Sequence, residues 1–175
     1  TASGMRLIVA VLSTVLGPAL GGMRLKAYPG GLREALDDVK GLARTMTLKA
    51  SAAGLDLGGG KAVMLDDGHP QQRLARMESA ARVIESLDGA YITAEDIGTT
   101  TADMDHVRRF TRFCTGRSFE NGGRGDPSPV TAETVLRAMR RGLAARLGSD
   151  ELDGRSVGVV GLGKVGGALA ARLSQ

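Results

Sequence analysis

The stretch Met46-Thr-Leu-Lys-Ala-Ser-Ala-Ala-Gly-Leu-Asp-Leu-Gly-Gly-Gly-Lys61 carries two lysines, Lys49 and Lys61, separated by an apolar turn and three consecutive glycines. Apolar residues recur at three- and four-residue steps before it, which predicts one buried helical stripe: Leu32, Leu36, Val39, Leu42, Ala43 and Met46. Gly54 is expected to end this helix in the left-handed conformation.

Lys49 continues the predicted stripe three residues after Met46, and Ala53 follows four residues later. A lysine on a core-facing stripe must either pair with an anion or lose its proton, because burying a bare ammonium costs too much free energy. Lys49 is therefore predicted to be a functional amine rather than an ordinary surface charge.

Lys61 follows three consecutive glycines at residues 58–60. Because glycine has no Cβ, the backbone there can approach a ligand closely or adopt a positive φ. It is expected to open a short strand over residues 62–65, and strand mouths are common places for catalytic groups in α/β folds. A phosphate-binding P-loop also ends in Gly-Lys but needs Gly and Ser or Thr where this chain has Leu55 and Ala62. The P-loop interpretation is therefore disfavoured.

Lysine is the rarer basic residue in this chain. Five of the 23 basic residues are lysines, at positions 26, 40, 49, 61 and 164, and the others are arginines. Arginine does not lose its proton near neutral pH, whereas a lysine amine does so when it is buried. The retained lysines therefore favour an amine that titrates.

Length and composition indicate a soluble globular chain large enough for one full domain, since it has 175 residues of which 42% are hydrophobic. The longest apolar run, residues 7–12, is too short to cross a bilayer, so no membrane partner is expected. The single Cys114 excludes an internal disulfide and a thiolate metal cage, predicts no metal site and fits the reducing cytoplasm. Because the chain begins at Thr1 rather than at methionine, we expect its true start to lie upstream.

Nucleic acid is not an expected partner, although the formal net charge is +4. The basic residues are scattered among 19 acidic ones, there is no tryptophan, and aromatic residues make up 3% of the chain. A single-strand binder needs stacking platforms and a duplex binder needs a basic face. The pattern favours a solvated surface of mixed charge.

Short apolar runs predict strands over residues 6–12, around residues 24–28 and over residues 90–93, with a glycine-punctuated loop over residues 13–22. His69 is expected to lie exposed in a turn. A helix is predicted over residues 71–87 by an apolar stripe: Leu74, Met77, Ala81, Ile84 and Leu87.

Asp96 stands directly after the strand predicted at residues 90–93, followed by Gly98 and three threonines. Polar residues at the carboxyl end of a strand are typical of a site in α/β folds. The alternative is a helix start, in which Thr100 and Thr101 with Asp103 cap a helix carrying Met104, Val107 and Phe110. Both interpretations hold together, because capping leaves Asp96 free.

A polar, glycine-rich segment over residues 116–129 predicts a boundary between a domain of residues 1–115 and a part spanning residues 116–175. Ser128-Pro129 then predicts a helix start, with Ser128 as the cap. This helix is expected to end at Gly148 and to turn one stripe inward: Ala132, Val135, Leu136, Met139, Leu143 and Leu147.

Residues 156–160 predict a strand, followed at once by Gly161-Leu-Gly163-Lys-Val-Gly166 and a helix. This Gly-x-Gly-x-x-Gly in its strand–helix context favours a bound dinucleotide over a plain tight turn, because the glycines admit a pyrophosphate to the helix N-terminus. The acidic residue that separates NAD from NADP would lie beyond Gln175. We therefore expect the start of a Rossmann domain in a truncated chain.

Five stretches together resemble the leucine, valine, phenylalanine and glutamate dehydrogenases, and they occur in that family's order. They are Leu16-Gly-Pro-Ala-Leu-Gly-Gly22, Met46-Thr-Leu-Lys49 to Gly58-Gly-Gly-Lys61, Tyr91-Ile-Thr-Ala-Glu-Asp-Ile-Gly-Thr-Thr100, Asp126-Pro-Ser-Pro-Val-Thr-Ala132 and Gly161-Leu-Gly-Lys-Val-Gly166. The lysine-to-lysine block is the specific one. The resemblance implies an α/β fold, with a mixed α/β substrate and oligomerisation domain before the Rossmann unit, and a homo-oligomer assembled through it.

The resemblance implies a role for each matching residue. Lys49 would hold the substrate α-carboxylate, Lys61 would activate the attacking water as a neutral amine, and Asp96 would exchange protons with the substrate amino group. Gly21 and Met46 would line the substrate site. The cofactor NAD would contact Thr131 at its nicotinamide end, and its pyrophosphate would contact three glycines: Gly161, Gly163 and Gly166. The implied reaction is NAD-dependent oxidative deamination of an L-amino acid to a 2-oxo acid.

Leu20 and Ala94 match the branched-chain members of the family, whereas the resemblance implies a glycine in place of Ala94 in the phenylalanine enzymes. Leu, Val and Ile are therefore the expected substrates. Met23 departs from the small threonine usual after the glycine pair, which affects the expected local loop. The alternative function is a non-catalytic N-terminal module that binds an amino acid or assembles without reducing anything.

Overall fold

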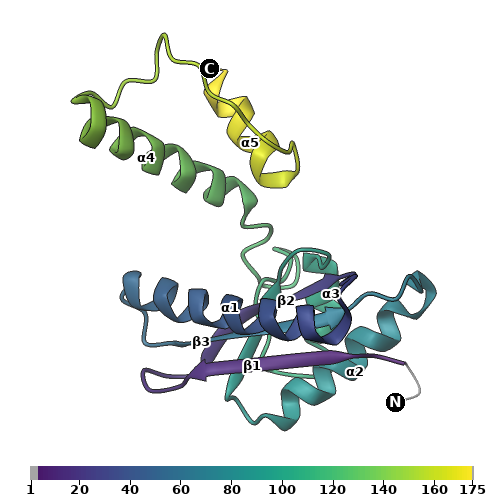
Figure 1. Cartoon of the computed structure of the whole chain (residues 1–175). Coiled ribbons are helices and arrows are strands. Elements are labelled where there is room, and N and C mark those ends of the chain that lie inside the picture. Colours follow the sequence, from purple (N-terminus) through teal and green to yellow (C-terminus); the bar gives the residue numbers. More distant parts are fainter. Residues whose placement is uncertain (1–3, 175) are drawn as a thin grey trace. The chain divides into compact units, whose positions relative to one another are not determined.

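A four-stranded mixed sheet organises the first part of the chain, with the strand order β1-β3-β2-β4 (Figure 1). The computed structural model describes residues 4–174 and places β1 at Leu7–Ser13, β2 at Ala19–Lys26, β3 at Gly58–Leu65 and β4 at Tyr91–Glu95. Strand β3 pairs antiparallel with β1 and parallel with β2, and β2 pairs parallel with β4. The expected α/β class is confirmed.

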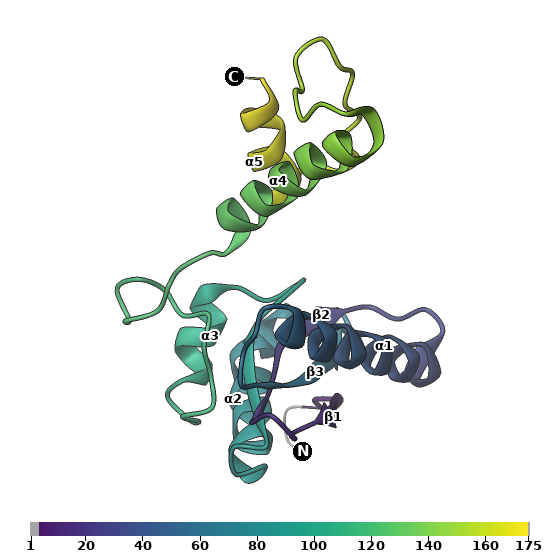
Figure 2. The ribbon, with the colours of Figure 1, turned by 90° about the vertical axis from the view of Figure 1, so that its left-hand side faces the viewer.

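Helix α1 (Gly31–Ala52) packs on one face of this sheet, and α2 (Arg73–Ser86) and α3 (Thr101–Val107) pack on the other (Figure 2). Successive residues of β3 alternate between the two sides. Val63 and Leu65 face α1, whereas Ala62 and Met64 join the core under α2 and α3. A short 3₁₀ helix, η1 (Pro70–Gln72), leads into α2.

The buried face of α1 differs from the predicted stripe. Its buried residues are small or β-branched, namely Ala35, Val39, Ala43 and Ala50, whereas Leu32 is 56% exposed. The reason is close packing of α1 on the sheet. A Cβ added at Gly59 would lie 2.1 Å from the backbone nitrogen of Thr47 in α1. Only small side chains fit at such a separation, so Leu32 and Leu48 are exposed and Leu36, Leu42 and Met46 are only half-buried.

The three glycines before Lys61 belong to β3 and not to a turn, so the predicted strand start at residue 62 is wrong. None of the three has a positive φ. They are needed because backbone and rings approach them closely: Cβ atoms at Gly58 and Gly60 would lie 1.8 Å from the Ser13 carbonyl oxygen and 2.8 Å from the Tyr91 ring. Lys61 therefore lies in the middle of a fully buried strand.

Strand β2 also begins earlier than predicted, since it starts at Ala19 and includes Gly21 and Gly22. These residues pair with β4 through Gly21↔Thr93 and Gly22↔Ala94, so the expected loop is shorter. Met23 is fully buried in the core with α2 and α3. The departure at this position therefore changes a core side chain and not a loop.

The opposite face of the sheet holds the larger hydrophobic core. Helix α2 contributes Met77, Ala80, Ala81 and Ile84, while the predicted Leu74 is 59% exposed. Helix α3 begins with the predicted capping box between Thr100 and Asp103, but it ends at Val107, so Phe110 lies beyond it. Gly54 has a φ of 64° just after α1, as predicted.

The second unit begins at Asp126 and contains α4 (Ser128–Leu147) and α5 (Lys164–Leu173), which pack on each other. Pro127 is the cap of α4, Ser128 is its first residue, and Gly148 ends it with a φ of 75°. Ala132 is buried, but Val135 and Leu147 of the expected inward stripe are exposed. Residues 156–160 form no strand, because no other described strand pairs with them. The predicted domain limits at residues 115 and 116 stay a prediction.

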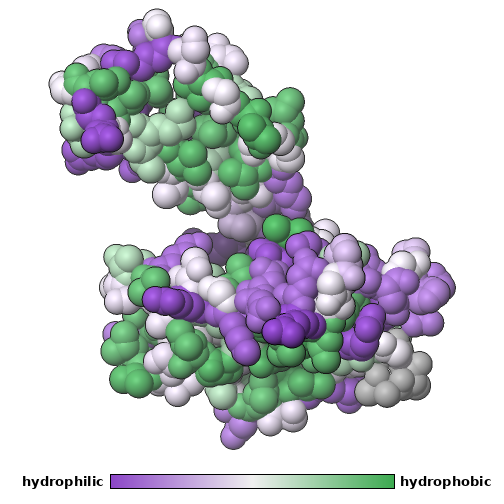
Figure 3. Space-filling model, in the orientation of Figure 1, coloured by the Kyte–Doolittle hydropathy of each residue, from purple (hydrophilic) through white to green (hydrophobic). Residues whose placement is uncertain are grey.

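Hydrophilic side chains gather over α1 on the surface of the first unit (Figure 3). The exposed residues of α1 include Arg33, Asp37, Lys40 and Arg44. Among the helices of residues 4–174, none is long and apolar enough to pass through a bilayer.

Candidate active site

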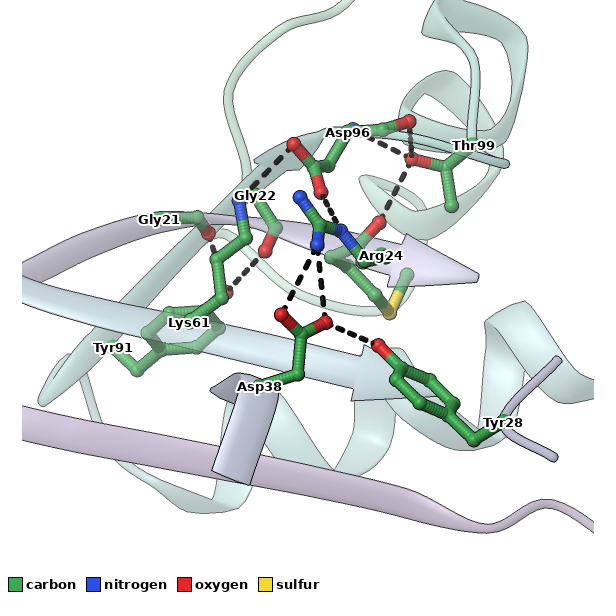
Figure 4. A network of polar contacts seen from close by, with 10 residues as sticks. Gly21, Gly22, Arg24, Tyr28, Asp38, Lys61, Tyr91, Asp96 and Thr99 are labelled. Carbon is green, nitrogen blue, oxygen red and sulfur yellow. Dashed lines mark hydrogen bonds and ion pairs between the residues drawn. The ribbon is translucent and has the colours of Figure 1, made fainter. Parts of the chain in front are cut away.

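Lys61 is the buried amine of the first unit, with 5% of its residue surface exposed. The alternation of β3 turns its side chain to the α1 side, between Gly59 and Val63. Its Nζ lies 3.1 Å from Oδ1 of Asp96 (Figure 4). The two residues proposed from the sequence to carry the chemistry therefore meet as an ion pair.

Asp96 is held by the turn that follows β4. Its backbone N–H donates to Oγ1 of Thr99 at 2.8 Å, and the Thr99 hydroxyl donates to the Met23 carbonyl oxygen at 2.9 Å (Figure 4). Gly98 has a φ of 79°, and a Cβ there would lie 1.9 Å from the carbonyl oxygen of Leu25. The glycine and the threonine after Asp96 therefore fix the turn that aims its carboxylate at Lys61.

Arg24, Asp38 and Tyr28 belong to the same polar network, and the sequence analysis missed all three. Arg24 donates from Nε to Oδ2 of Asp96 at 2.8 Å and from a terminal nitrogen to Oδ2 of Asp38 at 3.0 Å. The Tyr28 hydroxyl donates to Asp38 at 2.6 Å (Figure 4). The signal in the sequence was a charged residue inside the strand predicted around residues 24–28, and the structure pairs Arg24 with Val63 of β3.

Burial lowers the pKa of the Lys61 amine, because the charged form loses its hydration. Asp96 acts in the opposite direction, while the positive charges of Arg24 and Lys49 add to the lowering. For Arg24, burial opposes its charge, but Asp96 and Asp38 outweigh it and raise the pKa. The pKa of Lys61 is thus lowered, as expected, which favours the neutral form of the amine.

Lys49 is exposed, so its predicted burial is wrong. It precedes the buried Ala50 by one position, which is about 100° around the helix from the face that packs on the sheet. It lies in the last turn of α1, where the helix dipole favours a positive charge. Its charge still acts on Lys61, so the two amines share one neighbourhood.

The other predicted substrate residues surround the same part of the sheet. Leu20 pairs with Gly59 and Ala94 pairs with Gly22, so both lie in the strands that flank the site. Gly21 has no room for a side chain, since a Cβ would lie 1.7 Å from the Gly60 carbonyl oxygen, and its own carbonyl accepts from the Tyr91 hydroxyl (Figure 4). Met46 is half-buried on α1.

The predicted cofactor residues lie in the second unit. Gly161 has a φ of 88°, and a Cβ at Gly166 would lie 2.0 Å from the Gly161 carbonyl oxygen, so this tight turn requires both glycines. Gly163 caps α5 without a side-chain hydrogen bond, and a Cβ there would meet nothing within 4 Å. Thr131 is exposed in α4, and its hydroxyl donates to the Pro127 carbonyl oxygen at 3.0 Å.

Within residues 4–174 no three His, Cys, Asp or Glu side chains gather as a metal ion would require. The groups that the site offers are an amine, a carboxylate and a guanidinium. Such a set suits proton transfer and the binding of an organic anion.

Comparisons with known proteins point to one family. Residues 2–112 match the family model described as the Glu/Leu/Phe/Val dehydrogenase dimerisation domain. The chain is 46% identical over 173 residues to leucine dehydrogenase from Geobacillus stearothermophilus, covering 99% of this chain and 47% of that protein. It is 47% identical over 172 residues to valine dehydrogenase from Streptomyces virginiae, covering 98% and 48%.

A solved structure shows the same arrangement of elements. The hetero-hexameric glutamate dehydrogenase from Thermus thermophilus, in a form described as leucine-bound, aligns with a TM-score of 0.73 and 28% identity. The alignment covers 97% of this chain and 47% of that one. The chain thus spans about half the length of the curated relatives that it matches.

Proposed function

Because the chain belongs to the Glu/Leu/Phe/Val dehydrogenase family, we propose that its buried lysine–aspartate pair serves the oxidative deamination of an L-amino acid. The net reaction consumes the amino acid, NAD⁺ and water and yields the 2-oxo acid, ammonium, NADH and a proton. The observation that carries the proposal is the 3.1 Å contact between Asp96 Oδ1 and Nζ of Lys61, which is buried on β3.

Lys61 acts as the general base for water. A neutral amine takes a proton from the water that attacks the imine carbon of the oxidised substrate, and the lowered pKa of Lys61 supports this role. Asp96 exchanges protons with the substrate nitrogen and, through its contact with Lys61, with the amine. A carboxylate and an amine within hydrogen-bond distance provide a path for a proton from one to the other.

Lys49 binds the substrate α-carboxylate. Its exposed position supports this role, because an amine at the surface is accessible to an incoming carboxylate. The two lysines thus have different roles: Lys49 binds the substrate carboxylate, and Lys61 acts as the base.

Branched-chain amino acids are the proposed substrates. Leu20 and Ala94 line the side-chain pocket, with Gly21 and Met46 beside them, and the Ala94 methyl group narrows the pocket against an aromatic ring. A change of one methyl group supports discrimination of about 10- to 200-fold. The names of the leucine and valine dehydrogenase relatives support the same class.

NAD is the proposed cofactor, and the residues of the second unit fit its pyrophosphate. The turn of Gly161 and Gly166 leaves no Cβ in the way, and the N–H groups that open α5 lack a side-chain cap. Gly161, Gly163 and Gly166 would hold the pyrophosphate, and Thr131 would meet the nicotinamide end. When bound, the nicotinamide accepts a hydride from the substrate Cα.

The protein is proposed to work as a cytoplasmic homo-oligomer that assembles through its first unit. The match to a dimerisation domain and the hexameric state in the name of the Thermus relative support assembly. Cys114 is buried and free, which suits a reducing compartment.

The test is NADH formation from L-leucine by the full-length gene product, followed at 340 nm. We expect turnover with leucine, valine and isoleucine, and its loss in Lys61→Ala. A Lys40→Ala variant, which changes an exposed lysine on the outer side of α1, serves as the matched control and should keep its activity. Turnover that survives in Lys61→Ala contradicts the proposed role of the amine. A folded protein that binds a 2-oxo acid without any turnover supports the non-catalytic alternative.

A further inference from the structure

Asp96 is shared between two cations that come from different strands. Its Oδ1 faces Lys61 of β3, and its Oδ2 accepts from Nε of Arg24 of β2 (Figure 4). A carboxylate contacted on one oxygen alone can rotate, which would change both the distance and the direction of its bond to the amine. The second contact removes that freedom.

We propose that Arg24 is a positioning residue for this reaction, which holds Asp96 Oδ2 so that Oδ1 is directed at Lys61. The proposal rests on the proposed function of the lysine–aspartate pair. Arg24 itself touches neither substrate nor cofactor in this account, and it acts through the carboxylate that it holds.

Arg24 is in turn fixed from the opposite side. Its terminal nitrogen donates to both oxygens of Asp38 in α1, at 3.0 and 3.4 Å, and Asp38 also accepts from the Tyr28 hydroxyl at 2.6 Å. The planar guanidinium can face two carboxylates at once because its donors point in fixed directions, and the ammonium of lysine lacks this geometry. The chain Tyr28–Asp38–Arg24–Asp96 therefore links α1 to the reacting pair across the sheet face.

Arg24 also changes the charge balance at Lys61. The charged groups that act on the amine are Asp96 after β4, Arg24 on β2 and Lys49 on α1, while Asp38 of α1 is engaged by Arg24. Arg24 lowers the pKa of Lys61 by like-charge repulsion. It also donates a hydrogen bond to Asp96, which would otherwise pair with the Lys61 amine alone. Removing Arg24 should therefore raise the pKa of Lys61.

A purely structural role for Arg24 makes a different prediction, and the chain supplies a matched control. Arg73 on α2 forms a comparable pair with Asp103, through Nε at 2.8 Å and a terminal nitrogen at 2.6 Å, on the other face of the sheet. It has no part in the Lys61 network. Arg24→Gln and Arg73→Gln should both lower the thermal midpoint of unfolding, but only Arg24→Gln should change kcat and the pH profile of kcat/KM.

The experiment compares Arg24→Gln, Arg24→Lys and Arg73→Gln in the full-length gene product, with L-leucine and NAD⁺. The neutral Lys61 amine is the active form, so kcat/KM rises with pH through its pKa. In Arg24→Gln we expect this acidic limb to move up by about one pH unit and kcat to fall by about tenfold or more. Arg24→Lys keeps the charge but loses the two-sided geometry, so its limb should stay near that of the parent while kcat falls.

A second readout does not depend on turnover. Trace acetylation of Lys61 across pH, followed by peptide mass spectrometry, reports the pKa of the amine in each folded variant, with exposed Lys40 as the internal reference. The upward shift in Arg24→Gln and its absence in Arg73→Gln support the proposal. An unmoved pKa and pH profile in Arg24→Gln overturn it. If Lys61→Ala keeps its turnover, the proposed function fails instead, so the two failures are distinguishable.

Discussion

The two faces of the sheet each hold an arginine–aspartate pair, but the two carboxylates are used differently. On the α2 and α3 face, Asp103 accepts from Arg73 on both oxygens, and its Oδ2 also accepts from the backbone N–H and the hydroxyl of Thr100, which fixes a helix start. On the α1 face, Asp96 gives one oxygen to Arg24 and the other to a titratable amine. The same pair of residue types thus fixes a helix start on one side and contacts the proposed catalytic amine on the other.

The two faces of the sheet also differ in the size of the side chains that pack on them. Under α2 and α3 the core includes large side chains such as Met64, Met77 and Ile84. Under α1 the layer is thin, with Gly59 against Thr47 and alanines on the helix. The thin layer lies on the same face of the sheet as Lys61 and its partners.

The largest effect is expected from Lys61→Arg, which keeps a positive charge on the α1 face but removes the titratable amine. The guanidinium stays protonated, so it cannot act as a base, and kcat should fall by about 10³-fold. The measurement is steady-state NADH formation, with Lys40→Arg as the control. Activity within tenfold of the parent would show that no neutral amine is needed here.

Gly59→Ala tests the thin layer directly. The new methyl group would lie 2.1 Å from the Thr47 backbone, so α1 must move away, and the free energy of unfolding should drop by about 3 kcal/mol. Gly41→Ala on the outer side of α1 meets nothing within 4 Å and should gain up to about 1 kcal/mol. Urea unfolding followed by circular dichroism measures both. Equal stability of the two variants would contradict close packing at Gly59.

Asp103→Ala removes the structural carboxylate and should lower the free energy of unfolding by about 2 kcal/mol while leaving the pH profile of kcat/KM in place. Burial opposes ionisation of Asp103, but Arg73 and Thr100 outweigh it and lower its pKa. Its contribution is therefore present above about pH 4 and is lost as the pH falls through the lowered pKa. Urea unfolding at pH 7 and at acidic pH should show the gap between parent and variant closing. A difference in unfolding free energy that grows at acidic pH would contradict stabilisation by the ionised Asp103 carboxylate.

The smallest effect concerns the thick core alone. Ile84→Val removes one methylene from a fully buried side chain and should cost about 1 kcal/mol of unfolding free energy. Val83→Ala, one position along α2 and 39% exposed, should stay within about 0.5 kcal/mol of the parent. Urea midpoints separate the two, and a larger loss at Val83 would mean that this side of α2 is covered.

Local chemistry was predictable where neighbours in sequence decide it. The capping box of Thr100 and Asp103 and the left-handed glycines at residues 54 and 148 needed only adjacent residues. The face of α1 was not predictable in this way. Periodicity selected Val39 and Ala43 correctly, but the approach of helix to sheet buried Ala35 and Ala50 in place of the leucines and left Lys49 in solvent. Which side of a helix is buried depends on the separation of the layers, and one sequence does not contain that distance.

Arg24 illustrates the same limit within the site. Lys61 and Asp96 stood out because of their glycine-rich and strand-end surroundings, but Arg24 is a single charge in a strand that parallel pairing brings beside both. Similarly, residues 156–160 had the composition of a strand and formed none in the part of the chain described, since a strand needs a hydrogen-bonding partner.

The sequence by itself determined the α/β class, the left-handed glycines at residues 54 and 148 and the capping box of α3, because each depends on residue type and short spacing. The tertiary structure alone decided that β3 carries Lys61 in its middle, that Asp96 shares its oxygens between Lys61 and Arg24, and that Lys49 stays exposed. The physical reason is that charge pairing and burial depend on distances across the sheet, and these distances are fixed only when the strands pair and the helices pack.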